Sequence, residues 1–400
     1  MDDEALALFT LIARGAEDFK ARADRWTDAA VEQALETVKS VTSVTSVGSD
    51  VATADFVRTA EALVSPAADA HRATLRALAV QRAAVGPQTV SLYSPLYLSN
   101  ACTNRCVYCG FRHDNDIARL TLTDAAIERE ATMLAKSGVQ EVLLLTGEAP
   151  AQVGVDYVIR AIEITRSRFR TIGLEVFPMS VSEYARVCQA GASVLTLYQE
   201  TYDPRVYRQV HQAGRKRNFQ HRLSAPHRAV EAGFRSIGIG ALLGLGDWRF
   251  ETLALALHAR FLQALAPDLQ VSISFPRIRS AEGAVSARRA VDDDALIHMM
   301  SALRVLLPGV TLVLSTRETA ELRDALSGTL ATKLSAGSKT NPGGYSTEAT
   351  DGRGEQFEVH DHRPASVVAA SLVQRGFGVR GYVENMGGTR ALGTRLTFVG

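Results

Sequence analysis

The sequence predicts an α/β fold, a (β/α)8 barrel of the TIM type preceded by a helical extension. From about residue 90 onward, short runs rich in Val, Ile and Leu alternate with longer amphipathic segments, a pattern typical of repeated βα units and a parallel sheet. Eight such runs are present, and several of them end in, or are followed directly by, a polar or charged residue. The 400 residues leave room for a barrel of about 250 residues and a further segment.

Three segments are predicted along the chain. Residues 1–88 are rich in Ala, Glu, Leu and Arg at helical spacing and read as two helical stretches, with a Ser- and Thr-rich loop at 41–50 between them. The barrel occupies 89–380, and 381–400 form a C-terminal tail. The expected strands are short runs rich in β-branched or aliphatic residues. They are 91–99, 140–148, 172–178, 193–200, 235–245, 269–276, 309–318 and 329–337.

Charge and hydropathy exclude several classes of protein. Lys plus Arg total 44 against 43 Asp plus Glu, so a net charge of +1 gives no electrostatic reason to expect nucleic acid or an anionic membrane as a partner. No apolar run approaches the roughly 18 residues of a membrane helix, and the N-terminus lacks a basic region and a cleavage site. We therefore expect a soluble cytoplasmic protein with a small substrate.

The cysteines are distributed unevenly. Of four, Cys102, Cys106 and Cys109 fall within eight residues, which is a poor framework for disulfides in a chain of this length. Clustered thiols in a cytosolic protein indicate a metal site instead. Cys188 lies in a helical pattern among apolar neighbours, where a free cysteine is commonly a small buried hydrophobe.

The three clustered cysteines follow the first predicted strand on a single loop. Each thiolate of such a loop can bind one iron of a cubane cluster and leave the fourth iron open for another ligand. Zinc is the alternative, but a structural zinc site normally has four ligands, and the fourth would come from His113 or from farther away. A non-catalytic, zinc-binding scaffold thus stays open, and a colourless protein with stoichiometric zinc would identify it.

Polar side chains lie at or directly after the carboxyl ends of several predicted strands. In a parallel barrel the carboxyl ends of the strands form one rim, so these residues are expected to meet at a single mouth. The residues concerned are Glu148, Gln199, Glu200, Arg277 and Arg317.

The spacing C-x3-C-x2-C, with the aromatic Tyr108 directly before the last cysteine, resembles the radical S-adenosylmethionine (SAM) superfamily. This resemblance implies a 4Fe-4S cluster on the three cysteines, with SAM chelating the fourth iron through its amino and carboxylate groups. It also implies that the reduced cluster cleaves SAM to methionine and a 5'-deoxyadenosyl radical, which abstracts hydrogen from the substrate. A cluster of this kind is sensitive to oxygen, so the resemblance implies that the protein works in a reducing compartment.

A zwitterionic amino acid moiety such as that of SAM needs an acceptor for its ammonium and a cation for its carboxylate. Gly147 permits close backbone approach, and Glu148 or a nearby carbonyl can accept from the ammonium. Gln199 and Glu200 are candidates for the ribose hydroxyls, and Arg222 for the SAM carboxylate. Tyr108 completes the expected cofactor-binding set.

Over residues 90–365 the chain resembles the 2-iminoacetate synthase family, the tyrosine lyases of thiamine thiazole synthesis. The matching stretches are LYLSNACTNRCVYCGF, LLLTGE, YQETYDP, IGIGALLGLGDWR, SISFPRIR, LSTRE, SKTNPGGY and QFEVHDHRP, in this order. The resemblance implies cleavage of the Cα–Cβ bond of L-tyrosine to 2-iminoacetate and p-cresol, with 5'-deoxyadenosine and methionine as coproducts. Tryptophan lyases that make 3-methylindole-2-carboxylate are related, and a lyase that acts on tryptophan or another aromatic amino acid in a specialised pathway remains the alternative.

The resemblance also assigns substrate residues and partners. Arg317 would grip the carboxylate of the amino acid with its planar fork, and Ser335 and Tyr97 would orient it. The tail 381–400 contains no cysteine, which argues against the second cluster of the related hydrogenase-cofactor lyase. The stretch TNRCVYCGF is nearer to tyrosine lyases than to tryptophan lyases. A flavodoxin or ferredoxin as electron donor and a thiazole synthase as recipient of the product are the implied partners.

Overall fold

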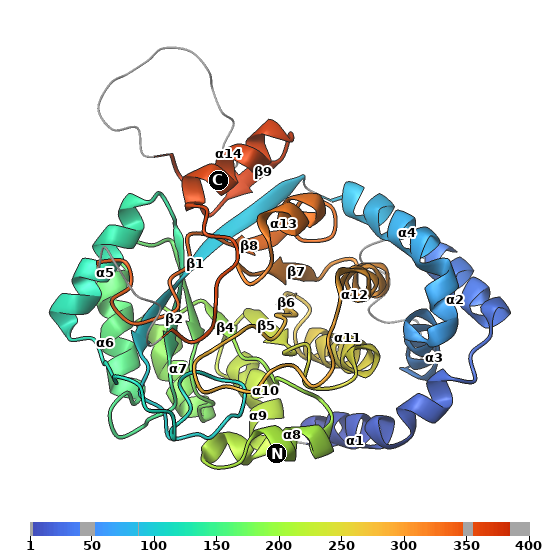
Figure 1. Cartoon of the computed structure of the whole chain (residues 1–400), viewed down its shortest axis with the longest axis horizontal. Coiled ribbons are helices and arrows are strands. Elements are labelled where there is room, and N and C mark those ends of the chain that lie inside the picture. Colours follow the sequence, from blue (N-terminus) through green and yellow to red (C-terminus); the bar gives the residue numbers. More distant parts are fainter. Residues whose placement is uncertain (1–2, 41–52, 87, 347–354, 385–400) are drawn as a thin grey trace.

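The barrel is closed, and the strands run in the expected order around it (Figure 1). The computed structural model describes residues 3–40, 53–86, 88–346 and 355–384. All neighbouring strands are parallel, and the first strand pairs with both the second and the eighth, which closes the ring. Each of the eight predicted runs overlaps one strand: β1 (Thr89–Ser99), β2 (Glu141–Thr146), β3 (Thr171–Glu175), β4 (Val194–Thr196), β5 (Ser236–Gly240), β6 (Gln270–Ser274), β7 (Thr311–Leu314) and β8 (Lys333–Ser335). The prediction of a (β/α)8 barrel is confirmed.

Helices surround the barrel and bury their apolar faces against the strands (Figure 1). Several begin at a capping side chain, as at Thr123, which accepts from the backbone N–H of Ala126, and at Ser180, which forms a capping box with Glu183. The barrel helices are α5 (Asp124–Lys136), α6 (Val155–Thr165), α7 (Val181–Ala190), α8 (Pro204–Val210), α9 (Phe219–Leu223), α10 (Ala225–Glu231), α11 (Trp248–Leu265), α12 (Asp293–Leu306), α13 (Ala320–Leu326) and α14 (Ala365–Gln374).

The N-terminal extension covers the outside of α11 and α12 (Figure 1). Arg249 at the start of α11 donates to the carbonyls of Val64 and Ser65 and forms an ion pair with Asp69. His298 on α12 lies 2.8 Å from the carbonyl oxygen of Leu63. The extension contains more helices than the two stretches expected: α1 (Asp3–Ala23), α2 (Asp28–Ser40), α3 (Thr53–Val64) and α4 (Arg72–Ala84), with a 3-10 turn, η1 (Pro66–His71), before the last. The expected loop at 41–50 lies outside the described residues.

A further short strand, β9 (Gly378–Arg380), was not predicted. It pairs in parallel with the first three residues of β1. Strand β1 is 11 residues long and pairs with β2 only from Ser94 onward, so its beginning has an edge for β9. Across the described ranges, no helix is both long and apolar enough to cross a membrane.

Candidate active site

A cavity opens at the carboxyl ends of the strands, where the sequence predicts the functional residues to meet. It encloses about 1040 Å³ of atom-free space, including the part open to solvent. Strands, the cysteine loop and the connection after β8 all contribute to its wall. Six of the predicted site residues line it: Tyr97, Tyr108, Cys109, Glu200, Arg317 and Ser335.

The cysteine loop follows β1 and closes one side of the cavity. Cys106 is buried, whereas Cys102 and Cys109 are partly buried, and all three thiols are free. The backbone N–H of Cys109 donates to the carbonyl of Cys106, which tightens the end of the loop into a turn. The Tyr108 hydroxyl lies 2.7 Å from Nε2 of the buried His211, so this aromatic ring is fixed beside the last cysteine.

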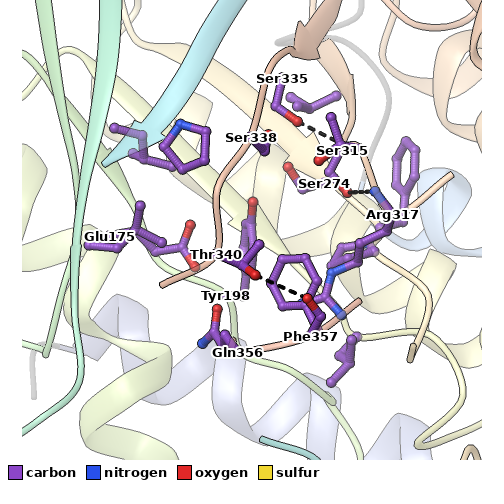
Figure 2. A pocket seen from close by; sticks show the side chains of 18 of the residues that line it. Glu175, Tyr198, Ser274, Ser315, Arg317, Ser335, Ser338, Thr340, Gln356 and Phe357 are labelled. Atoms are coloured by element: carbon purple, nitrogen blue, oxygen red, sulfur yellow. Dashed lines mark hydrogen bonds between the residues drawn. The ribbon is translucent and has the colours of Figure 1, made fainter. Parts of the chain in front are cut away.

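Arg317 follows β7 and faces the cavity from the side opposite Glu175 (Figure 2). Its guanidinium carbon lies 3.4 Å from the ring centroid of Phe357, and Nη1 is 3.4 Å from the carbonyl oxygen of Arg277. Within the described residues no carboxylate lies within ion-pair distance of it, because the adjacent Glu318 pairs with Arg277 and Arg279 instead. Arg317 therefore presents to the cavity a positive charge that has no ion-pair partner among the described residues.

Tyr97 and Ser335 lie on β1 and β8 and line the same cavity. Burial raises the pKa of Tyr97 well above its usual value, so its hydroxyl stays protonated and donates to Oε1 of Gln356 at 2.6 Å. Nε2 of Gln356 in turn lies 3.8 Å from Sγ of Cys109. The Ser335 hydroxyl accepts from the backbone N–H of Thr316 at 3.0 Å. Gln356 thus connects the predicted substrate residue Tyr97 to the cysteine loop.

Glu200 stands out for its backbone. Its φ of 72° is the single positive value at a non-glycine residue in the described ranges, and such strain is most often kept at functional sites. Its carboxylate accepts from Nζ of Lys216 at 2.7 Å and lies 3.7 Å from Nη2 of Arg222. Arg222 is buried, donates through Nε to the carbonyl of Tyr198 and does not line the cavity. The cation that reaches the cavity on this side is Lys216.

Gly147, Glu148 and Gln199 do not line the cavity. A Cβ on Gly147 would meet the carbonyl oxygen of Ala101 at 2.1 Å, so this glycine is needed for contact with the cysteine loop itself. The Glu148 carboxylate accepts from Asn104 at 2.7 Å, which also ties it to that loop. Gln199 donates to a backbone carbonyl at 3.4 Å, while its buried Oε1 has no partner within the described residues.

Known proteins with the same sequence pattern and fold exist. The model of the radical SAM superfamily matches residues 96–257, and that of the biotin and thiamin synthesis associated domain matches 274–378. The 2-iminoacetate synthase of Escherichia coli (strain K12) is 41% identical over 318 residues, which are 79% of this chain and 84% of that protein. This chain belongs to the radical SAM superfamily, in the 2-iminoacetate synthase family.

Two further known proteins agree with this placement. The 2-iminoacetate synthase of Salmonella typhimurium is 40% identical over 79% of this chain and 84% of its own length. The solved structure of HydG, a maturase of the FeFe-hydrogenase, superposes with a TM-score of 0.82 at 27% identity, covering 92% of this chain and 79% of HydG. The protein is a radical SAM enzyme that uses a 4Fe-4S cluster and SAM, as the sequence predicts.

The cysteine loop has the chemistry that a radical SAM cluster requires. Burial raises the pKa of Cys106 to about 12 and also raises that of Cys109, so both thiols hold their protons in the absence of metal. Because the thiolate is the form that binds metal, each releases its proton when it binds iron. In the part of the chain that the structure describes, no three His, Cys, Asp or Glu side chains surround one metal-ion position. His113, the candidate fourth zinc ligand, is exposed, with Nδ1 3.3 Å from the carbonyl oxygen of Cys102. Three separate iron ligands fit this arrangement better than one tetrahedral zinc.

Several cavity residues were not predicted from the sequence. Glu175 is the last residue of β3, and its place at the carboxyl end of a strand could have been predicted from the sequence in the same way as that of Arg317. Lys216 reaches the cavity from a short 3-10 turn after α8, and Gln356 and Phe357 reach it from the connection after β8. Gln356 and Phe357 lie in the family motif QFEVHDHRP, which located a functional segment but assigned no role to either side chain.

The pKa of Glu175 leads to a stability prediction. Burial and the neighbouring Glu200 raise this pKa from 4.5 to about 7, although Arg317 opposes the shift. The folded state then holds this proton more tightly than the unfolded state, so the group's contribution to stability falls as the pH rises from 4.5 through 7. Glu175→Gln is expected to remove this fall and to increase the free energy of unfolding at pH 8 by on the order of 1–3 kcal/mol.

Thermal denaturation of both proteins at pH 5 and pH 8 measures the effect of Glu175→Gln. The difference in midpoint should be large at pH 8 and small at pH 5. The exposed Glu321→Gln is the matched control and should leave both midpoints unchanged. Equal midpoints of the Glu175→Gln variant and the original protein at pH 8 would show that the surroundings do not raise the pKa of this carboxyl.

Proposed function

We propose that this enzyme is a tyrosine lyase that cleaves the Cα–Cβ bond of L-tyrosine to 2-iminoacetate and p-cresol, with formation of 5'-deoxyadenosine and methionine. The observation that carries the proposal is Arg317, whose positive charge faces the cavity without a carboxylate partner in the described residues. The carboxylate of an amino acid complements such a guanidinium in shape and charge. The 41% identity to a protein named 2-iminoacetate synthase supports tyrosine as that amino acid.

The two ends of the cavity suit two ligands. Cys109, Tyr108, Glu200 and Lys216 form the end next to the cysteine loop, where a zwitterionic cofactor finds both a carboxylate and a cation. We assign SAM to this end. When bound together, the cluster and SAM supply the 5'-deoxyadenosyl radical that starts the reaction. Arg317 marks the substrate end.

The residues of this chain provide position and shielding. We propose that Arg317 holds the substrate carboxylate and that its stacking on Phe357 keeps the guanidinium in one orientation. Ser335 and Tyr97 lie on β8 and β1, so rigid strands carry their hydroxyls toward the substrate. The Tyr97 hydroxyl keeps its proton and acts as a hydrogen-bond donor. Its acceptor in the structure is Gln356. Fixed geometry is the main contribution of a protein whose cofactor performs the difficult step.

The role of the other predicted residues is indirect in this proposal. Glu148 and Gly147 support the cysteine loop through Asn104 and Ala101, and Arg222 holds Glu200 from behind. Loss of any of these contacts would shift the loop or the strained Glu200 backbone rather than remove a direct ligand contact. We therefore treat them as positioning residues.

The proposed reaction has consequences for location and partners. A cluster that must be reduced to act requires a reducing compartment, so we place the enzyme in the cytoplasm. The electron donor is proposed to be a flavodoxin or a ferredoxin. The imine product is reactive toward water, and we propose a thiazole synthase as the enzyme that receives it in thiamine synthesis, consistent with the match to a thiamin synthesis associated domain.

The test is an anaerobic assay of the reconstituted and reduced enzyme with SAM and one amino acid at a time. With L-tyrosine, mass spectrometry should detect p-cresol, 5'-deoxyadenosine and 2-iminoacetate or glyoxylate, its hydrolysis product. L-Tryptophan should be turned over at least about tenfold more slowly, and L-phenylalanine tests the need for the phenol hydroxyl. Consumption of tryptophan alone, with 3-methylindole-2-carboxylate as product, would overturn the assignment of tyrosine while leaving the cluster in place.

A further inference from the structure

One segment of this nearly neutral chain is strongly basic. Residues 204–230 contain seven Lys or Arg residues and no Asp or Glu, although the whole chain has a net charge of only +1. The segment covers α8, α9 and most of α10, together with η2 (Arg215–Arg217). Neither the cavity nor the proposed reaction accounts for most of these charges, because only Lys216 of the seven lines the cavity.

The basic segment lies directly against the cysteine loop. The backbone N–H of Arg105 donates to the carbonyl of Ala213 at 3.1 Å, and that of Gln212 donates to the carbonyl of Arg105 at 2.9 Å. The N–H of Val107 donates to the carbonyl of Val210 at 3.0 Å. Cys106, which lies between Arg105 and Val107, is therefore covered on its outer side by the backbone of this segment.

Four arginines around this contact form what we call the basic face: Arg208, Arg215, Arg217 and Arg288. All four are exposed. None of them has an ion-pair partner among the described residues, and the side chain of Arg288 contacts Gln209 at 2.5 Å. Arg288 joins the face because its loop also reaches the cysteine loop, where Val285 N–H donates to the carbonyl of Val107 at 2.9 Å.

Other exposed arginines nearby differ from the basic face in being neutralised. Arg105 pairs with Asp114 at 3.0 Å, and Arg289 pairs with Asp247 at 3.1 Å. Uncompensated surface charge of one sign raises the rate at which an oppositely charged protein arrives and orients it on arrival. The arginines of the basic face, which have no ion-pair partner among the described residues, thus lie on the two segments that hydrogen-bond to the loop around Cys106.

We propose that the basic face is the docking surface of an acidic one-electron carrier protein, which delivers electrons to the cluster across the segment over Cys106. The inference rests on the proposed function in one respect, the need for an external reductant. Electron tunnelling weakens steeply with distance, so a donor must dock beside the loop that holds the cluster. Complexes of this kind bury little area and rely on charge for their formation, which suits a face of exposed arginines.

The test uses the full-length enzyme with its cluster reconstituted, a purified flavodoxin of net negative charge as the probe, and two triple variants. Arg208→Glu/Arg215→Glu/Arg217→Glu reverses three charges of the basic face. The control, Arg76→Glu/Arg166→Glu/Arg170→Glu, makes the same change in net charge at exposed arginines outside the basic face, on α4 and on the connection from α6 to β3.

The first measurement is the affinity for the flavodoxin at low and at high salt. The basic-face variant should bind at least about tenfold more weakly at low salt, and the control variant within about twofold of the original enzyme. High salt should remove most of the difference, because exposed charges are screened. Equal affinities of the original enzyme and the basic-face variant would overturn the proposal, as would binding of a mixed-sequence oligonucleotide in place of the flavodoxin.

The second measurement is the rate of cluster reduction, followed by loss of the visible absorption, with reduced flavodoxin or with dithionite. The basic-face variant should be slowed about tenfold or more with flavodoxin and unchanged with dithionite. Slowing with both reductants while flavodoxin binding is retained would overturn the docking role. Cluster reduction requires no amino acid substrate, so this result stands apart from whether tyrosine is the one consumed.

Discussion

Cys106→Ala is expected to abolish the cluster and all cleavage of SAM. Cys106 is the buried member of the three cysteines, and its neighbours in the loop are held by backbone hydrogen bonds to the basic segment. Two remaining thiolates cannot hold a cubane in which three irons need protein ligands. Reconstituted protein should be colourless, with iron, acid-labile sulfide and 5'-deoxyadenosine all at background.

Cys188→Ala is the matched control for this prediction. Cys188 lies on α7, where its side chain is partly buried and packs against the apolar core, so the same substitution should leave the brown cluster intact. Far-ultraviolet circular dichroism should show the same helix content in both variants. A full complement of iron and sulfide in the Cys106→Ala protein would contradict the assignment of the cluster ligands.

The fold was predictable because its signal repeats. Eight aliphatic runs alternate with amphipathic helices, and each repeat is a βα unit whose buried strand and half-buried helix leave distinct patterns. Strand β9 was not predictable in the same way. It has three residues, it follows α14 outside the repeat, and only the free beginning of β1 makes it a strand. Local composition cannot report such a pairing.

The site was predictable where a strand or a motif fixes the position of a residue. Arg317, Tyr97 and Ser335 lie on or directly after strands, and all three line the cavity. Gln199 and Glu200 show the limit of this rule. They are neighbours at the same strand end, yet only Glu200 lines the cavity, because successive residues of an extended chain point to opposite sides. The positive φ at Glu200 alters this alternation further, and no residue type signals it.

The cavity residues outside the strands could not be predicted from the sequence for a different reason. Gln356 is 21 residues beyond the end of β8, and Lys216 is 20 residues beyond the end of β4. Where a long connection returns to the barrel mouth depends on tertiary contacts such as the Lys216 backbone N–H to Asn104 at 2.9 Å. The functional stretch could be located by its resemblance to a family, whereas the side chain that enters the cavity required the three-dimensional arrangement.

Arg317→Ala is expected to keep the cluster and to lose most turnover of tyrosine. The guanidinium contacts the Phe357 ring and the carbonyl of Arg277 and makes no recorded contact with the cysteine loop among the described residues, so its removal should not disturb iron binding. Loss of one partner of a charge pair in a desolvated site costs about 2–5 kcal/mol, and each 1.36 kcal/mol corresponds to about tenfold. We therefore expect kcat/KM for tyrosine to fall about 30- to 5,000-fold.

The comparison with Arg317→Lys separates charge from geometry. Lysine keeps the positive charge but lacks the planar fork and stacks less well on Phe357, so it should restore only part of the lost kcat/KM. Iron content and the visible absorption of the cluster should match the original enzyme in both variants, which excludes general damage. If Arg317→Ala turned over tyrosine at the original rate at low substrate concentration, the carboxylate would have to bind elsewhere. Lys216 would then be the group to test, because it is the other cation that lines the cavity, although its charge is already shared with Glu200.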